Sequence, residues 1–234
     1  MTITWKRAGA AALATTLFAT SFAAAGSGAF AQDRAGIADP ETAQTEIQLP
    51  EAAAEPQVRF VASETVQERF EQLRIAHNAI EAGMARVDLE GGVTKVLLHS
   101  FAHLLIRQLA FDSGYDSSSI CERIYASDGP DGMAGVLLYT ASGDSEGTLG
   151  GLVRQGRPEY LPSTVSAALE NGRYCSSDPL CVESTGQGLN SLNLAACHSC
   201  SLLPETSCEM SNMLLDRALV IGHPSKSKLA YFAG

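Results

Sequence analysis

Five of the six cysteines of this 234-residue chain lie within residues 174–212. This segment is otherwise rich in turn-forming residues, which predict little regular structure. Thiolates so close in sequence can converge on one tetrahedral ion, and that ion then holds together loops that lack a hydrophobic core of their own. The segment is therefore predicted to be a structural zinc site, with four ligands drawn from Cys175, Cys181, Cys197, Cys200 and Cys208.

The centre of this segment is a C-x-x-C turn formed by Cys197 and Cys200. Such a turn on its own also occurs in redox proteins, but three further thiols nearby favour a metal. Two alternatives stay open: disulfide bonds in an exported form, and unligated or redox-active thiols. His198 is expected to be a neighbour of the ion, because adjacent residues rarely reach the same ion as both cysteines of the turn. Cys121 is expected to be a small buried hydrophobic residue in a short helix.

The first 31 residues resemble an export signal. Lys6 and Arg7 precede an uncharged run of apolar and small residues over 8–25, and residues 29–31 fit a small-x-small cleavage site. The run contains Ala, Thr and Ser more than Leu or Ile, so no stable membrane association is expected. A spurious upstream start and a disordered arm are the alternatives.

The rest of the chain divides into two parts by composition. Residues 32–58 have few large apolar side chains and predict a disordered linker. Residues 59–234 are long enough for one domain with a core of its own.

The chain is acidic, with a formal net charge of −10. Residues 1–31 carry two positive charges and no acidic residue, so the remainder has a charge of −12. Neutralising a phosphate backbone requires clustered Lys and Arg. Nucleic-acid binding by this chain alone is therefore disfavoured.

The hydrophobic pattern predicts an α+β domain that is mostly helical, with a small sheet and a Cys-rich lobe near the C-terminus. Apolar residues from Val66 to Met84 recur at three- and four-residue steps, which indicates an amphipathic helix. A more apolar helix is expected over 93–111, a short helix ending at Ile124, and a buried strand over 133–140. Two further helices are expected over 161–172 and 207–221.

Four polar residues follow one narrow stripe of the helix predicted over 93–111, and they are Lys95, His99, His103 and Arg107. We interpret this stripe as a polar seam that meets another element. Two imidazoles at positions i and i+4 can also share a zinc ion in a hydrolase. Here Ser100 follows the first histidine in place of the glutamate that would act as general base, so the hydrolase is the weaker hypothesis.

A Gly-rich turn over 142–152 follows the predicted strand. Such turns can bind phosphates at a helix N-terminus. The turn lacks the lysine of a phosphate-binding loop, and Asp144 and Glu146 would repel an anion. Close packing of a strand-to-helix corner is the favoured interpretation.

Several motifs closely resemble the C-terminal part of DrmB proteins. The resemblance covers about residues 60–234, and it is carried by residues 96–106, 132–142, 144–152, 175–181, 192–200 and 204–209, with Asn212, Leu215, Asp216 and Arg217. It implies the MrfA-type zinc-binding domain, a former domain of unknown function that accompanies superfamily 2 helicases.

DrmB is the partner of such a helicase in the DISARM anti-phage system. The resemblance therefore implies a cytoplasmic, non-catalytic, zinc-stabilised part of a DNA-processing complex, which contacts DNA through the complex. DrmB proteins carry several hundred residues ahead of this region, so a truncated remnant of the family is one expectation. The alternatives from other classes are an exported or periplasmic disulfide-bonded protein and the zinc hydrolase.

Overall fold

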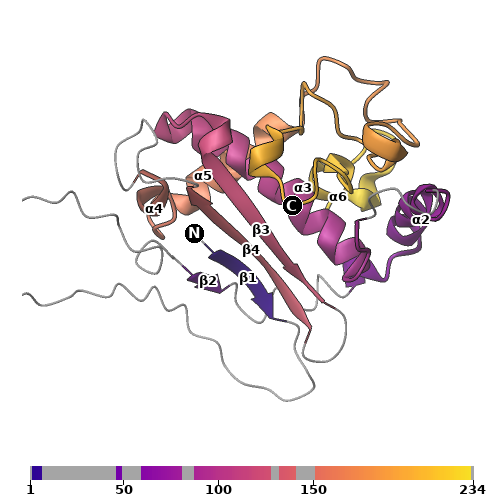
Figure 1. Cartoon of the computed structure of the whole chain (residues 1–234), viewed down its shortest axis with the longest axis horizontal. Helices are drawn as coiled ribbons and strands as arrows, with labels where there is room; N and C mark the ends of the chain where they lie inside the picture. Colours follow the sequence, from indigo (N-terminus) through magenta and orange to yellow (C-terminus); the bar gives the residue numbers. More distant parts are fainter. Residues whose placement is uncertain are drawn as a thin grey trace, which may run out of the picture.

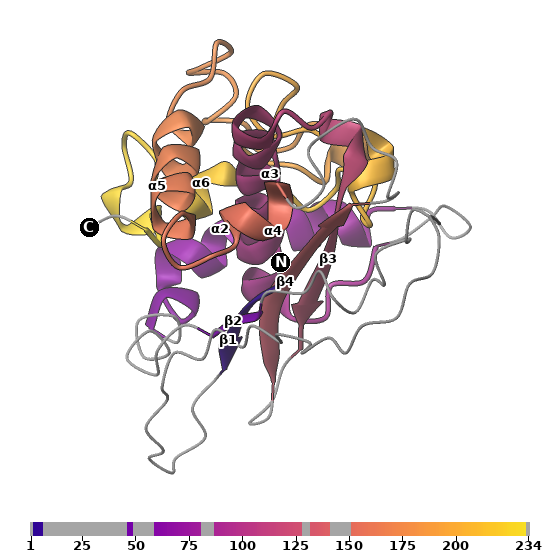
Figure 2. The same cartoon turned by 90° about the vertical axis from the view of Figure 1, so that its left-hand side faces the viewer.

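The computed structural model describes residues 2–6, 46–48, 59–80, 87–127, 132–140 and 151–232. Over these residues the chain forms the expected α+β domain, with helices on one face of a small sheet (Figures 1 and 2). The Gly-rich turn lies outside the described residues, except at its end. Residues 7–45 and 49–58 also lie outside them, so the division into a signal-like segment and a linker stays a prediction.

The sheet has four strands in the order β2-β1-β4-β3. Strand β3 (Ile120–Ala126), at one edge, forms an antiparallel hairpin with β4 (Met133–Thr140), in register from Ile120 opposite Thr140 to Ala126 opposite Ala134. Next to β4 lies β1 (Thr2–Lys6), antiparallel to it, and β2 (Glu46–Gln48) pairs parallel with β1.

Helix α3 (Gly92–Ser113) is the centre of the fold. Most of its side chains are buried, because it packs against β3 and β4 on one side and against helices on the other. The helix begins after Gly91 and ends before Gly114, which have positive φ values of 82° and 70°. This conformation favours glycine, so these two residues set the boundaries of the helix.

The remaining helices pack around α3. Its first turn lies near α2 (Glu64–Asn78), and its other contacts include α4 (Gly151–Gln155), α5 (Leu161–Gly172) and α6 (Arg217–Ile221). Figure 2 shows α5 and α6 on the side of α3 away from the sheet. Three predicted elements are confirmed: the apolar helix over 93–111, the buried strand over 133–140 and the helix over 161–172. The amphipathic helix is shorter than predicted, since it ends at Asn78.

Two sequence predictions of helix are wrong. The stretch that ends at Ile124 is strand β3, because its backbone pairs with β4 along its whole length. Of residues 207–221 only α6 is α-helical. Ser207 ends a short 3₁₀ segment, and the residues before α6 form turns in which Ser211, Asn212 and Leu214 have positive φ. The Asn212 side chain binds both backbone groups of Leu203, so it competes with a helix there.

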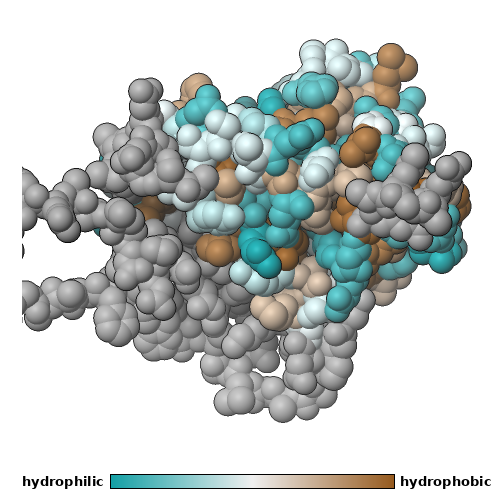
Figure 3. All heavy atoms as spheres, viewed as in Figure 1, coloured by the Kyte–Doolittle hydropathy of each residue, from teal (hydrophilic) through white to brown (hydrophobic). Residues whose placement is uncertain are grey.

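The Cys-rich lobe follows α5 and contains turns, short 3₁₀ segments and isolated bridges, including one between Asn193 and Leu215. It is drawn in orange and yellow in Figure 1. Figure 3 shows hydrophobic and hydrophilic residues interspersed over the described part of this face of the molecule. Within the described residues, no helix is long and apolar enough to cross a membrane.

Candidate metal centre

Four cysteine sulfurs converge in the Cys-rich lobe, those of Cys175, Cys181, Cys197 and Cys200. The Sγ atoms of Cys175 and Cys197 are 3.5 Å apart, those of Cys181 and Cys200 3.7 Å, and those of Cys197 and Cys200 3.8 Å. All four lie within 4.8 Å of one another. Four sulfurs at about 2.3 Å from a tetrahedral zinc ion lie about 3.8 Å from each other. The four thiols therefore fit a zinc ion with no further ligand.

The sulfur spacing is also longer than the S–S bond of about 2.05 Å in a disulfide. All six cysteines are free. The geometry of the lobe is thus that of a ligand set and not of paired half-cystines.

Local turns supply the ligands. The Cys200 backbone N–H donates to the Cys197 carbonyl at 3.1 Å, which closes the C-x-x-C turn and brings both thiols to one side. The Cys197 N–H and the Ser201 hydroxyl donate to Cys200 Sγ at 3.3 and 3.4 Å. The Ser177 N–H donates to Cys175 Sγ at 3.4 Å. Such donors stabilise thiolate charge and orient the sulfurs toward the centre.

Electrostatics also favour ionised sulfur in the lobe. The hydrogen bond from Cys181, together with that from Ser201, lowers the pKa of Cys200 to about 4. The same bond raises the pKa of Cys181, because Cys181 keeps the shared proton. The buried Arg217 guanidinium also favours the Cys200 thiolate. A metal ion that displaces the shared protons would therefore meet partly ionised ligands.

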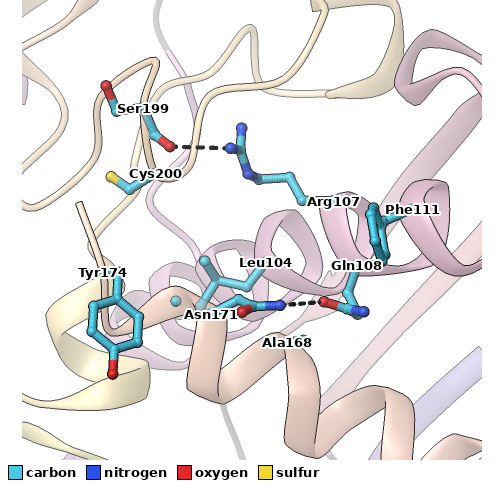
Figure 4. A pocket seen from close by; sticks show the side chains of 10 residues that line it. Leu104, Arg107, Gln108, Phe111, Ala168, Asn171, Tyr174, Ser199 and Cys200 are labelled. Carbon is cyan, nitrogen blue, oxygen red and sulfur yellow. Dashed lines mark hydrogen bonds between the residues drawn. The ribbon is translucent and has the colours of Figure 1, made fainter. Parts of the chain in front are cut away.

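A small cavity adjoins the cysteine turn. It has a volume of about 390 Å³ and lies between α3, α5 and the turn (Figure 4). At its wall the Arg107 guanidinium donates to the Ser199 carbonyl at 3.0 Å, and Asn171 donates to Gln108 at 2.7 Å. Arg107 therefore ties the C-x-x-C turn to α3, as expected of the polar stripe.

The fifth predicted cysteine, Cys208, lies in another group. Its sulfur is 3.1 Å from Nε2 of His99, and the two residues share a buried cluster with His103 and Glu122. The histidine spacing was visible in the sequence. Glu122 was missed, because nothing local links a strand residue to a helix 19 residues earlier.

The fold and the sulfur cluster thus define a small α+β domain built around a four-cysteine metal centre. Comparison with known proteins gives the domain type: residues 101–201 match the MrfA Zn-binding domain. The chain is also 47% identical over 145 residues to the DISARM protein DrmB of Bacillus paralicheniformis. That alignment covers 62% of this chain and 25% of the relative, so the chain spans about a quarter of the relative's length.

These matches confirm the resemblance found in the sequence. Residues 101–201 are similar to a zinc-binding domain of the MrfA type, and together with the four-cysteine group this similarity identifies zinc as the cofactor. The matched residues contain all four clustered cysteines, and they exclude His99 and Cys208.

Proposed function

We propose that this chain is a non-catalytic, zinc-stabilised accessory domain that partners a superfamily 2 helicase in DNA processing or anti-phage defence. The observation that carries the proposal is the 47% identity over 145 residues to part of a DISARM protein. Residues 101–201, which match the MrfA Zn-binding domain, contain the four clustered cysteines. The proposal places the functional domain in the cytoplasm, where such a partner meets DNA.

The ligand geometry supports a structural role for the zinc ion. Four protein thiolates complete a tetrahedral shell, so no position is left for a water or a substrate. The histidines of the hydrolase hypothesis, His99 and His103, have no exposed surface. A substrate could reach them only if the core opened.

The rim of the cavity offers a surface for the helicase partner. Phe111 and Tyr174 line the cavity and are 84% and 71% exposed, beside the exposed Arg107 (Figure 4). Aromatic and arginine side chains around a hollow are the groups that most often dominate the binding energy of protein interfaces. The C-x-x-C turn forms one wall of this hollow. The zinc ion would therefore hold in place part of the surface that binds the partner.

The acidic charge of the chain supports indirect contact with DNA. With a net charge of −10 it would be repelled by a phosphate backbone. In this proposal the helicase makes the DNA contacts.

Binding to a purified DISARM helicase subunit tests the proposal. Titration calorimetry should show a complex with the zinc-loaded chain, and Phe111→Ser with Tyr174→Ser should weaken it at least about tenfold, the loss expected when two interface anchors are removed. Ile75→Ser is the matched control, since Ile75 is 61% exposed on α2, beside the beginning of α3 (Figure 1).

Metal analysis of each variant must show unchanged zinc content. The absence of any complex contradicts the helicase partnership, and equal weakening by Ile75→Ser contradicts the assigned surface. Tight binding of a DNA duplex by the chain alone contradicts indirect DNA contact.

A further inference from the structure

A second group of potential metal ligands lies where α3, β3 and the turn with Cys208 meet. His99 and His103 come from one face of α3, Glu122 from β3, and Cys208 from the turn after residues 205–207. Their exposed fractions are 0%, 0%, 2% and 6%. One ligand atom from each residue lies within 4.8 Å of the others.

The atoms that approach one another are those that bind metals. Nε2 of His99 is 2.9 Å from Oε1 of Glu122 and 3.1 Å from Sγ of Cys208. Nε2 of His103 is 3.2 Å from the same Oε1. The two imidazole rings are nearly perpendicular, at 88°, with centroids 4.4 Å apart. Both rings thus direct Nε2 toward one centre.

The opposite ring nitrogens fix this orientation. Nδ1 of His99 lies 3.3 Å from the Leu214 carbonyl, and Nδ1 of His103 lies 2.8 Å from the Ser201 carbonyl. A carbonyl oxygen only accepts, so each Nδ1 carries a proton and donates it. A neutral imidazole then has its lone pair on Nε2, which is the usual arrangement of a metal-bound histidine with a backbone partner.

The acceptor atoms of Glu122 and Cys208 outnumber the hydrogen-bond donors that reach them. Oε2 of Glu122 is buried and has no hydrogen-bond partner within the described part of the chain, although a buried carboxylate oxygen without one is costly. The Asn212 N–H donates to Cys208 Sγ at 3.2 Å. A cation at the centre would satisfy both imidazoles, the carboxylate and the thiolate together.

We propose that His99, His103, Glu122 and Cys208 bind a second structural zinc ion. Two neutral imidazoles, one carboxylate and one thiolate carry two negative charges, so a divalent cation leaves the buried site neutral. A mixed nitrogen, oxygen and sulfur set suits zinc and is unsuited to Mg²⁺ or Ca²⁺, which prefer oxygen ligands. With four protein ligands that are all buried, the site is closed to substrate.

The two metal centres share no ligand, but they are connected. Ser201, whose carbonyl orients His103, directly follows the ligand Cys200 and donates its hydroxyl to the Cys200 sulfur. The second zinc ion would join α3, β3 and the Cys-rich lobe, whereas the first holds only the lobe. The competing state is a metal-free cluster in which two extra protons sit on the imidazoles and give the same net charge.

Metal analysis and X-ray absorption at the zinc edge of the full, reduced wild-type chain distinguish the two states. Two sites require two zinc ions per chain and about 2.5 sulfur neighbours per zinc, because five thiolates are shared between two ions. One zinc ion per chain with about four sulfur neighbours would overturn the proposal. This measurement needs no variant.

Isosteric variants then show which residues bind which zinc ion. Glu122→Gln and Cys208→Ser should each lose one zinc ion and raise the average sulfur count of what remains to about four. Cys200→Ser should lose the other ion and leave one with a single sulfur neighbour. Cys121→Ser, adjacent to Glu122 but outside both clusters, should keep both ions. If Cys208→Ser retains the wild-type zinc content and sulfur count, the assignment is wrong.

Discussion

Arg217 Nη2 lies 2.5 Å from Oδ1 of Asp178 and forms an ion pair between the start of α6 and the loop that carries Cys175 and Cys181. Arg217 is 1% exposed and also donates to the Gly172 carbonyl at 3.1 Å. The pair therefore joins the first two zinc ligands to the helical part of the domain.

Replacing Asp178 by Ala should lower the free energy of unfolding by about 3 kcal/mol, because it removes the carboxylate that pairs with the buried Arg217 charge. Urea unfolding of the zinc-loaded protein measures the loss. Glu71→Ala removes an exposed i,i+3 pair with Arg74 and should produce no measurable change. Equal effects of the two substitutions would mean that the Arg217 pair is not structurally important.

Loss of a sulfur from the four-cysteine centre should remove its ion. Cys200→Ser is expected to bind one zinc ion fewer than the wild-type chain, and to unfold at least about 3 kcal/mol more easily, since the binding free energy of a structural zinc ion contributes to folding. A chelator should also lower the unfolding free energy of the wild type. The check is elemental analysis beside thermal unfolding, with Cys121→Ser as the variant that should behave like the wild type.

The two glycines that bound α3 should respond differently to alanine. A Cβ at Gly91 would lie 2.7 Å from the Ala126 carbonyl oxygen, whereas at Gly114 nothing lies within 4 Å. Gly114→Ala should cost about 1 kcal/mol from its positive φ alone, and Gly91→Ala should cost more because β3 must also shift. Chemical denaturation of both variants gives the comparison, and a Gly114→Ala cost that equals or exceeds that of Gly91→Ala contradicts it.

Tyr231 should contribute to loss of stability at alkaline pH. Burial raises its pKa above the ordinary 10.0, and its ring packs on Phe60 and Phe232 with centroid distances of 5.3 and 4.8 Å. The raised pKa is that of the folded state. The stability that the buried, neutral Tyr231 contributes is therefore complete below pH 10, and it decreases as the pH rises through the folded pKa.

Tyr231→Phe should therefore flatten the decline in unfolding free energy above about pH 10 and leave its value near pH 8 little changed. Denaturant titrations at a series of pH values give the two curves. Parallel curves for Tyr231→Phe and the wild type would show that Tyr231 plays no part in the alkaline loss.

Several elements could be predicted because their signals are local. The helix α3 is apolar on most of its surface and is bounded by glycines, and β4 contains a short unbroken apolar run from Val136 to Tyr139. The stretch before Ile124 was assigned the wrong type, since a short apolar run fits a helix or a strand equally well. Its pairing with β4 decided the matter.

The sequence alone determined the α+β class, the central helix, the cysteine-rich segment and the choice of zinc as its metal, because these follow from periodicity and from thiolate chemistry at short spacing. Only the tertiary structure decided which cysteines act together. Cys208 and His99 are 109 residues apart, and they meet because α3 packs against α6 and the His99 ring contacts the Leu214 carbonyl in the turns before it. Contacts over such a separation depend on how whole elements pack, and no local pattern in the chain contains that information.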